Sequence, residues 1–260
     1  MHVAALYRYP VKGFTHEECK VLSVLDGGRI AGDRVLGVRF NDSTIPDDAW
    51  GTKLEFVSLA NTPGLARLQL AFNPGTRKLR IERQGQVLVD ETLDDVGRKR
   101  IAAAVEDYVL ALDENPLSSR PGRLPLRVVG DGVTPRYQDQ EPGYVTLHGR
   151  PSLATVAAFG ASDLSERRFR SNIAIDDLAA WEEQSWISRT IRIGDIKFEV
   201  VSAKARCLAT HANPLTGERD LPMMKMLLQV FPRERPTFAI AMRTDRGGSI
   251  HVGDKVELCE

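Results

Sequence analysis

The chain has 260 residues, a length that fits one large domain or two of modest size. Apolar residues make up 42% of it and charged residues 27%, which is typical of globular proteins and argues against disorder or a fibrous repeat. Thirty-five Lys and Arg residues balance 35 Asp and Glu residues, and the resulting net charge of zero disfavours a chain-wide nucleic-acid surface. A local basic pocket is compatible with this balance.

The three cysteines, Cys19, Cys207 and Cys259, are too few and too scattered for a disulfide framework or a four-cysteine zinc site. No stretch approaches the ~20 uncharged apolar residues of a membrane span. The apolar run at the N-terminus is interrupted by Pro10 and Lys12, so no signal peptide is expected. We therefore expect a cytoplasmic protein with reduced cysteines and no membrane partner.

Short apolar or alternating runs bounded by turn residues predict strands through most of the first 90 residues. The turn Asn-Pro-Gly at 73–75 joins two of them and is typical of a meander of antiparallel strands. The expected strands cover residues 3–9, 19–25, 34–40, 65–72, 78–83 and 87–89.

One helix follows these strands. Asp94 or Asp95 can cap it, and apolar residues spaced about one helical turn apart carry it to Val109. Residues 116–122, rich in Pro, Ser and Gly, then break the pattern. We expect a domain boundary between residues 118 and 119.

The second part, residues 119–260, contains further strands and a short helix. The Gly-Asp pairs at 194–195 and 253–254 each separate two alternating runs, and each predicts a hairpin. No alternating βαβ pattern or glycine-rich phosphate loop is found, which disfavours a Rossmann or P-loop enzyme. The predicted class is mainly β with a few helices (α+β), as barrels or sandwiches. The expected helix covers 151–159, and the expected strands cover 126–129, 168–175, 190–193, 196–201, 238–242, 249–252 and 255–258.

Several polar residues stand at the ends of these expected strands. Lys12 lies beside Gly13, where a cation can reach an anion that the backbone also approaches closely. Arg34 opens one strand, and Arg170 and Asn172 open another. Their guanidinium and amide groups suit phosphate groups and heterocycle edges, although each arginine alone is as typical of an ion pair with a nearby acid. If they converge in space, they form a cationic pocket.

The segment after the strand at 196–201 carries the most chemistry. Cys207 follows Arg206, whose charge stabilises a thiolate, so the thiol suits a nucleophile or a soft-metal ligand. His211, four residues later, allows a zinc pair or a Cys-His dyad with Thr210 and Asn213 as polar neighbours. Neither a second ligand pair nor a supporting signature follows. A buried, inert thiol is the other interpretation.

These motifs resemble the MOSC family, the domain at the C-terminus of molybdenum cofactor sulfurases. The similarity is to its two-part members, which include the mitochondrial amidoxime-reducing component and its bacterial relatives. The motifs that carry the resemblance follow the family's order over nearly the whole chain: LYRYPVKG at 6–13, GGRIAGDR at 27–34, EFVSLANTPGLA at 55–66, RFRSNI at 168–173, Arg206-Cys207 with Thr210 and PLTG at 214–217, and GSIHVGD at 248–254.

The resemblance implies an N-terminal MOSC-associated β-barrel domain at 1–118 and a MOSC β-barrel domain at 119–260. It implies a molybdenum cofactor (molybdopterin) whose metal is bound by Cys207, which is also the catalytic residue. Pyridoxal phosphate is a second phosphate-bearing cofactor that the resemblance allows. By position, the residues that would hold the molybdenum cofactor are Lys12, Gly13, Arg34, Arg170, Asn172, Arg206 and Thr210.

The function implied is an oxidoreductase that reduces small N-hydroxylated or N-oxygenated compounds. Because no ferredoxin-like cysteine cluster follows the MOSC part, electrons are expected from a separate ferredoxin-, flavin- or cytochrome-type protein. The alternative is a non-catalytic carrier that holds the cofactor, or sulfur as a persulfide, on Cys207. A β-rich protein with a decayed site is the third interpretation. No nucleic acid or membrane partner is expected.

The sequence departs from the family pattern at four places. His211 stands where close relatives have a second Thr, Asn213 stands where they have Asp, and Gly13 stands where the mitochondrial enzymes have Ser. Residues 139–143 lack the hydroxyl pair expected to face the cofactor. We expect these differences to affect substrate preference and cofactor retention.

Overall fold

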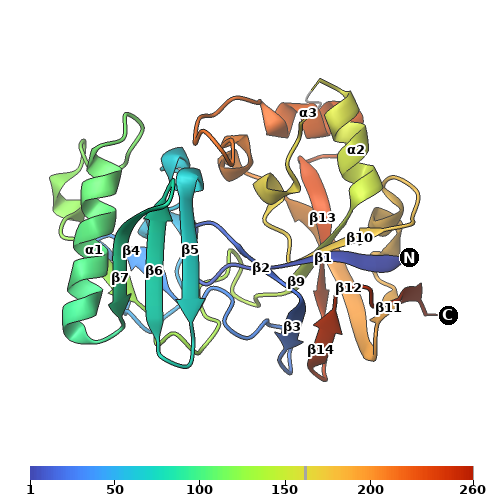
Figure 1. Cartoon of the computed structure of the whole chain (residues 1–260). Coiled ribbons are helices and arrows are strands. Elements are labelled where there is room, and N and C mark those ends of the chain that lie inside the picture. The colour runs from blue at the N-terminus through green and yellow to red at the C-terminus, as the bar shows by residue number, and fades with distance from the viewer. Residues whose placement is uncertain (161–162, 260) are drawn as a thin grey trace.

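The computed structural model describes residues 1–160 and 163–259. Two groups of elements lie side by side in Figure 1: a three-stranded sheet with one long helix, and a larger sheet with two shorter helices above it. Most of the described residues outside loops are in strands, and three α-helices are found among them. The predicted class, mainly β with a few helices, is confirmed.

The largest sheet combines strands from both ends of the chain. All of its neighbouring strands are antiparallel except β9 and β10. Backbone hydrogen bonds from Val3 N to the Asp254 carbonyl at 2.9 Å and from Val256 N to the Met1 carbonyl at 3.0 Å also bring one edge of the sheet back against its N-terminal strand, so the sheet is barrel-like. From edge to edge the order is β15 (Val256–Leu258), β11 (Thr190–Ile193), β12 (Ile196–Ala205), β13 (Thr237–Arg243), β9 (Val145–Gly149), β10 (Ile173–Asp176), β1 (His2–Arg8) and β2 (Glu17–Cys19).

The parallel pair forms a β-α-β unit. Strand β9 leads into α2 (Arg150–Ala158), and the chain returns as β10 beside β9, with Ile173 opposite Leu147. This single unit is not an alternating βαβ fold, but the sequence pattern did not predict it. The polar residues Thr146 and His148 interrupt the apolar run of β9, although every residue of this strand is buried. Because of these two polar residues, the hydrophobicity of the sequence does not indicate a buried parallel strand here.

Three smaller sheets complete the molecule. The meander expected near the N-terminus is confirmed, and so is the hairpin of β11 and β12. The small sheets are β3 (Val21–Val24) with β14 (Gly248–His251), β4 (Gly37–Arg39) with β8 (Arg127–Val129), and β5 (Leu68–Asn73), β6 (Lys78–Arg83) and β7 (Gln86–Thr92) in that order.

The second predicted hairpin, 249–252 with 255–258, is wrong. Strand β14 pairs with β3 and strand β15 pairs with β11, so the two strands enter different sheets. Between them the Asp254 carboxylate accepts a hydrogen bond from the backbone N of His251 at 2.7 Å. This local turn separates the strands instead of joining them into a ladder.

The long helix α1 (Asp95–Leu110) begins as predicted. Asp94 caps it by accepting a hydrogen bond from the Gly97 backbone N at 2.7 Å. In the described part of the chain, no helix combines the length and apolarity that a bilayer span requires. The remaining helices are α3 (Met223–Val230) and the 3-10 helices η1 (Lys53–Glu55), η2 (Pro63–Arg67), η3 (Pro121–Arg123), η4 (Glu166–Phe169), η5 (Glu182–Trp186) and η6 (Leu208–His211).

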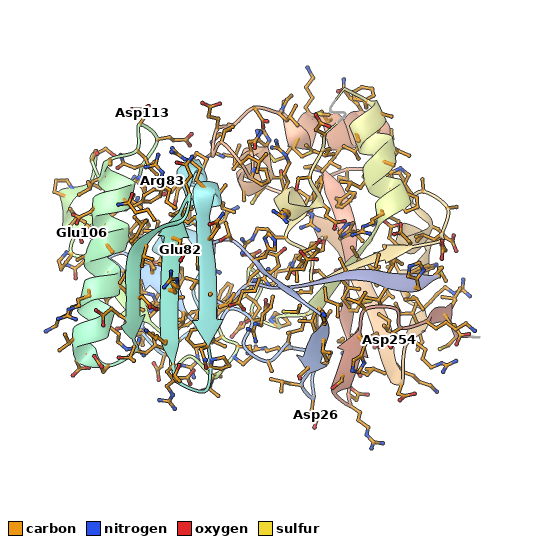
Figure 2. All side chains as sticks on the ribbon, in the orientation of Figure 1. Asp26, Glu82, Arg83, Glu106, Asp113 and Asp254 are labelled. Atoms are coloured by element: carbon orange, nitrogen blue, oxygen red, sulfur yellow. The ribbon has the colours of Figure 1, made fainter. Side chains whose placement is uncertain are left out.

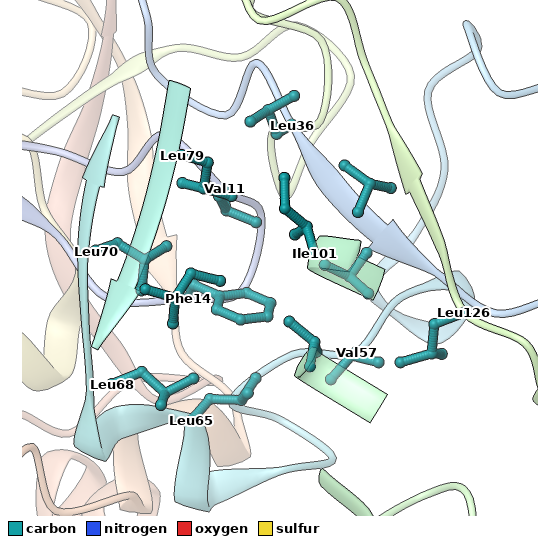
Figure 3. Packing of buried hydrophobic residues seen from close by; sticks show 14 of the residues in the cluster. Val11, Phe14, Leu36, Val57, Leu65, Leu68, Leu70, Leu79, Ile101 and Leu126 are labelled. Carbon is teal, nitrogen blue, oxygen red and sulfur yellow. The ribbon is translucent and has the colours of Figure 1, made fainter. Parts of the chain in front are cut away.

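Each group of elements has its own hydrophobic core. In the first core, Phe14 packs among side chains from β5, β6 and α1, including Leu70, Leu79 and Ile101 (Figure 3). The second core lies between the large sheet and the pair β3–β14. Strand pairing crosses the expected boundary between residues 118 and 119, because β1 pairs with β10, β3 pairs with β14 and β4 pairs with β8.

Candidate functional site

A cavity of about 370 Å³ lies where segments of the first 60 residues meet η4, η6 and the end of β12. It is called the thiol cavity here, because Cys207 lines it and no other cysteine is among its described lining residues. The expected convergence is observed for most of the predicted residues. Those in its wall are Gly13, Arg34, Arg170, Asn172, Arg206, Cys207 and Thr210.

Lys12, the remaining predicted residue, lies directly behind this wall. Its side chain is 1% exposed, and its Nζ donates hydrogen bonds to the carbonyls of Tyr137 and Gln138, both at 2.9 Å. The Nζ also lies 3.8 Å from Oδ1 of Asp139, a residue that lines the cavity. Burial lowers the pKa of Lys12 to about 8. The positive charge of the Lys12 ammonium therefore attracts anions in the cavity from behind its wall.

Gly13 is required by the shape of its loop. Its φ is +77°, and a Cβ at this position would lie 2.5 Å from the Ser58 Cβ. The Leu59 backbone N donates to the Gly13 carbonyl at 3.0 Å, which ties the two loops together. Any side chain at this position would be strained in this loop conformation.

Arg34 and Arg170 approach one aromatic ring. Their guanidinium carbons lie 4.8 Å and 4.4 Å from the centre of the Tyr9 ring, and both residues have the left-handed backbone that side chains rarely adopt. Arg34 pairs with Asp33 at 2.5 Å, as the ion-pair interpretation expected. Arg170 instead donates to the Phe14 carbonyl. Burial and the nearby Arg34 lower the pKa of Arg170.

Both the oxygen and the nitrogen of the Asn172 side-chain amide form hydrogen bonds within the protein. Its Oδ1 accepts from Oγ1 of Thr146 at 3.0 Å, and its Nδ2 donates to the Tyr7 carbonyl at 3.2 Å and to Asp33 at 3.4 Å. These contacts link β1, β9 and the loop that carries Arg34. In this structure Asn172 positions the cavity wall.

Arg206 and Cys207 stand at the end of β12. The Arg206 guanidinium donates to the carbonyls of Phe169 and Phe238, at 2.7 Å and 2.6 Å, and burial lowers its pKa to about 10. Cys207 is partly exposed and directly precedes η6. The interpretation of Cys207 as a sealed core thiol is therefore wrong.

The residues expected as polar neighbours of Cys207 have other contacts. Thr210 donates from Oγ1 to the Cys207 carbonyl at 2.9 Å. His211 does not line the cavity, and its Nε2 accepts from the Met224 backbone N at 3.4 Å. Among the described residues no group of three or more His, Cys, Asp or Glu side chains could hold a metal ion. A zinc pair or Cys-His dyad with His211 is thus not supported.

A buried ion pair holds the loop that follows Cys207. Arg168 binds both carboxylate oxygens of Asp220, at 2.7 Å and 2.8 Å, and also donates to the His211 carbonyl at 3.0 Å. Asn213 donates to the same Asp220 carboxylate at 2.7 Å. These contacts of Arg168, Asp220 and Asn213, called the clamp here, hold the loop that follows the Cys207 thiol.

Residues 141–257 match the family model described as the MOSC domain. This part of the chain is a MOSC domain. The family expected from the sequence motifs is thereby confirmed. Arg170, Asn172, Arg206, Cys207 and the loop after it come from the MOSC domain, whereas Gly13 and Arg34 come from the residues before it.

Curated relatives agree with this assignment. Mitochondrial amidoxime reducing component 2 of Homo sapiens is 28% identical over 161 residues, which cover 58% of this chain and 47% of the relative. Mitochondrial amidoxime-reducing component 1 of Homo sapiens is 30% identical over 132 residues, 47% of this chain and 38% of the relative. Molybdenum cofactor sulfurase of Caenorhabditis briggsae is 33% identical over 132 residues, 50% of this chain and 18% of the relative. The chain thus spans about half or less of the length of these relatives.

Sequence reasoning missed several charged residues of the cavity, among them Lys53, Lys204 and Asp139. Lys204 belongs to the MOSC domain, and its Nζ donates to Oε1 of Gln140 at 2.9 Å. Burial lowers the pKa of Lys204 to about 8. The alternation of β12 places Lys204 on the same face as Arg206, and this signal would have found it.

Asp139, just before the MOSC domain, is the only carboxylate among the described lining residues of the cavity. Other carboxylates lie at the edges of the molecule in this view, such as Asp26 at the bottom and Asp113 at the upper left (Figure 2). The surrounding protein raises the pKa of Asp139, but Lys12 and the cavity cations outweigh this effect and hold it well below its usual range. The thiol cavity is therefore strongly cationic apart from one carboxylate, whose side chain is 57% exposed.

Proposed function

We propose that this chain is a molybdenum-cofactor oxidoreductase that reduces small N-hydroxylated compounds, with Cys207 as the protein ligand of the metal. The observation that carries the proposal is the position of the Cys207 thiol in one cavity with the arginines Arg34 and Arg170. A thiolate suits a soft metal held by dithiolene sulfur, and guanidinium groups suit the phosphate of the same cofactor. Both kinds of ligand are thus available within about 370 Å³.

The donors of the cavity fit a pterin with a phosphate. Two buried polar atoms of its wall, Oγ of Ser58 and Oε1 of Gln138, have no hydrogen-bond partner among the described residues. A hydroxyl and an amide oxygen can pair with the donors and acceptors on a heterocycle edge. Gly13 lets the backbone lie directly against Ser58 in the same wall, where a side chain would collide.

When bound, the molybdenum cofactor supplies oxygen-atom transfer coupled to two electrons. Arg34 and Lys204 would hold its phosphate, and Lys12 would add positive charge from behind the wall. Thr210 and the Arg168–Asp220 pair keep the Cys207 loop in place. Because Lys12 and the cavity cations hold the pKa of Asp139 well below its usual range, this carboxyl can hold or release a proton only at low pH. These residues thus bind and orient the cofactor, while the ammonium groups of Lys12 and Lys204, whose pKa values burial lowers to about 8, can exchange protons near that pH.

The names of two relatives support the substrate class, since both are amidoxime-reducing components. Amidoximes are N-hydroxylated bases, and they are the substrates to try first. We propose a separate ferredoxin-, flavin- or cytochrome-type protein as the electron donor.

The test is made on full-length protein from a host that synthesises the molybdenum cofactor. We expect the purified wild type to contain molybdenum and pterin and, with a chemical reductant, to convert an aromatic amidoxime to the amidine. Cys207→Ser should lose the metal with little loss of stability, whereas Cys259→Ser, a partly exposed cysteine outside the cavity, should retain it. Wild-type protein that takes up no cofactor when it is supplied would overturn the proposal.

A carrier of sulfur is the second candidate function. It is favoured by the partial exposure of the Cys207 thiol and by the relative named molybdenum cofactor sulfurase. In that case Cys207 would carry a persulfide, which mass spectrometry detects on the peptide that contains it. Robust amidoxime turnover by metal-loaded protein would exclude the carrier, and transfer of labelled sulfur without turnover would support it.

A further inference from the structure

A second cavity, of about 410 Å³, lies next to the thiol cavity. The two share the wall residues Leu59, Arg168, Arg170 and Ala209. One side of the second cavity is formed by β5, the strand of the meander that faces the MOSC domain in Figure 1. The other side is formed by η4 and the loop after Cys207. It is called the arginine cavity here, after Arg67, Arg167, Arg168 and Arg170.

The charge of these arginines is largely uncompensated. No Asp or Glu is among the described lining residues of the arginine cavity. Arg168 is neutralised by Asp220, but neither Arg67 nor Arg167 forms an ion pair with a described carboxylate, and Arg170 contacts only a carbonyl by hydrogen bond. Three guanidinium groups that converge on a concave surface attract an anion.

The rest of the lining is apolar or weakly polar. Ala66, Ala212 and Pro214 contribute apolar surface, and Leu215 stands at the rim with 81% of its surface exposed. Oγ1 of Thr15, a lining residue, is buried and has no hydrogen-bond partner among the described residues. A ligand with an apolar body and one anionic group would use both kinds of surface.

The neighbouring histidine adds no positive charge near neutral pH. Burial and the adjacent Arg167 lower the pKa of His16 to about 4, so the ring is neutral and offers one donor and one acceptor. The positive charge of the cavity therefore comes from its arginines.

We propose that the arginine cavity binds a small organic anion, a phosphate or carboxylate group on an apolar body. Guanidinium forks match the oxygens of both groups, and the volume lies within the range of small-molecule sites. Concave walls from two parts of the chain favour a small molecule over the flat acidic surface of a partner protein. This site is distinct from the thiol cavity, and its existence does not rest on the proposed function.

The experiment is calorimetric titration of the full chain with phenyl phosphate at constant ionic strength, with phenol as the uncharged control. Arg67→Gln combined with Arg167→Gln removes two guanidinium groups that line only this cavity. Because each charged hydrogen bond contributes substantially, we expect the affinity to fall at least about tenfold. The matched control is Arg233→Gln with Arg235→Gln, an exposed pair outside both cavities that changes the net charge equally. Circular dichroism and urea midpoints verify that each variant is folded.

Four outcomes would overturn the proposal. The first is equal binding by the wild type and the Arg67/Arg167 variant, and the second is an equal loss in the control variant, which would indicate only general attraction. The third is loss of binding in Lys204→Gln alone, which would assign the phosphate to the thiol cavity and leave the proposed function intact. If phenyl phosphate does not bind but an acidic electron-transfer protein requires Arg67 and Arg167, the surface is a protein contact and the proposal also fails.

Discussion

The Nζ of Lys12 lies 3.8 Å from Oδ1 of Asp139, so a fully buried ammonium and the one carboxylate of the thiol cavity face each other across its wall. Burial lowers the pKa of Lys12 to about 8, while the Asp139 charge opposes that shift. Lys204, which also lines the cavity, has its pKa lowered to about 8 as well. Both ammonium groups are therefore charged at pH 7 and largely neutral at pH 9.

This pair of titrations predicts that the thiol cavity loses anion affinity as pH rises through about 8. Sulfate is the probe, since its own charge is constant between pH 6 and pH 9.5. From pH 7 to pH 9 the charged fraction of each lysine falls about tenfold, and the affinity should fall at least about as much. Isothermal titration calorimetry measures the sulfate affinity at each pH. In Lys204→Arg one charge no longer titrates, so the fall should be shallower, and an unchanged slope would contradict the assignment.

Replacing the carboxylate tests the relationship directly. In Asp139→Asn the ammonium of Lys12 loses a favourable partner, so its pKa should drop further below 8. The midpoint of the sulfate titration then moves to lower pH, while the affinity at pH 6 rises because the repulsion between carboxylate and sulfate is gone. An upward shift of the midpoint would show that Asp139 does not stabilise the ammonium.

Gly13 gives a prediction for stability. Alanine at this position is strained by the φ of +77° and collides with Ser58, so Gly13→Ala should lower the free energy of unfolding by about 2–4 kcal/mol. Gly27 is the matched control, since its φ is +84° but a Cβ there meets nothing within 4 Å. Gly27→Ala should cost only about 1 kcal/mol. Urea unfolding measures both, and equal losses would exclude the contact with Ser58 as the cause.

The parts of the fold that the sequence predicted are those decided by neighbours along the chain. The cap at Asp94, the meander of β5 to β7 and the hairpin of β11 and β12 each depend on a local turn or period. The β9–α2–β10 unit and the separation of β14 from β15 depend instead on partners far away in sequence. Local patterns do not encode those partners.

The candidate site also has features that local sequence predicts and features that depend on distant partners. Most of the residues that the motifs identified lie in the wall of the thiol cavity, because several of them stand at or near the ends of strands. They did not reveal that the Asn172 amide forms hydrogen bonds to both β9 and β1. These bonds depend on the order of strands in the sheet. Asp139 was missed because a single acidic residue in an irregular segment has no pattern of its own.

The clamp on the Cys207 loop yields a prediction that combines stability and reactivity. Asp220→Asn leaves the buried Arg168 with a weaker partner and should cost about 2 kcal/mol, less than a fully buried pair because Asp220 is about one-third exposed. The loop should loosen, and Cys207 should react faster with a thiol reagent. Peptide mass spectrometry follows each cysteine separately, with Cys19 as the internal reference. Glu199→Gln, which breaks an exposed pair, should change neither quantity.

A second buried network anchors the segment that carries Arg168 and Arg170, and it predicts a pH dependence. Glu166, at the start of η4, accepts hydrogen bonds from Tyr7 at 2.5 Å, from Arg150 at 3.0 Å and from His148 at 3.2 Å. Burial raises the pKa of Glu166, but His148 and Arg150 outweigh it and hold the pKa far below its usual range.

A carboxyl whose folded pKa is depressed stabilises the protein above its unfolded pKa of 4.5, and this contribution is lost as pH falls toward the folded value. Glu166→Gln should therefore cost about 2 kcal/mol at pH 7, and the difference from the wild type should shrink below pH 4.5. Urea unfolding at pH 7, 5 and 3.5 measures it. Because Glu166 raises the pKa of His148 in the folded protein, the contribution of His148 differs between the two proteins, and both are therefore compared in a His148→Gln background. A gap between the two proteins that stays constant down to pH 3.5 would mean that Glu166 is not held ionised by this network.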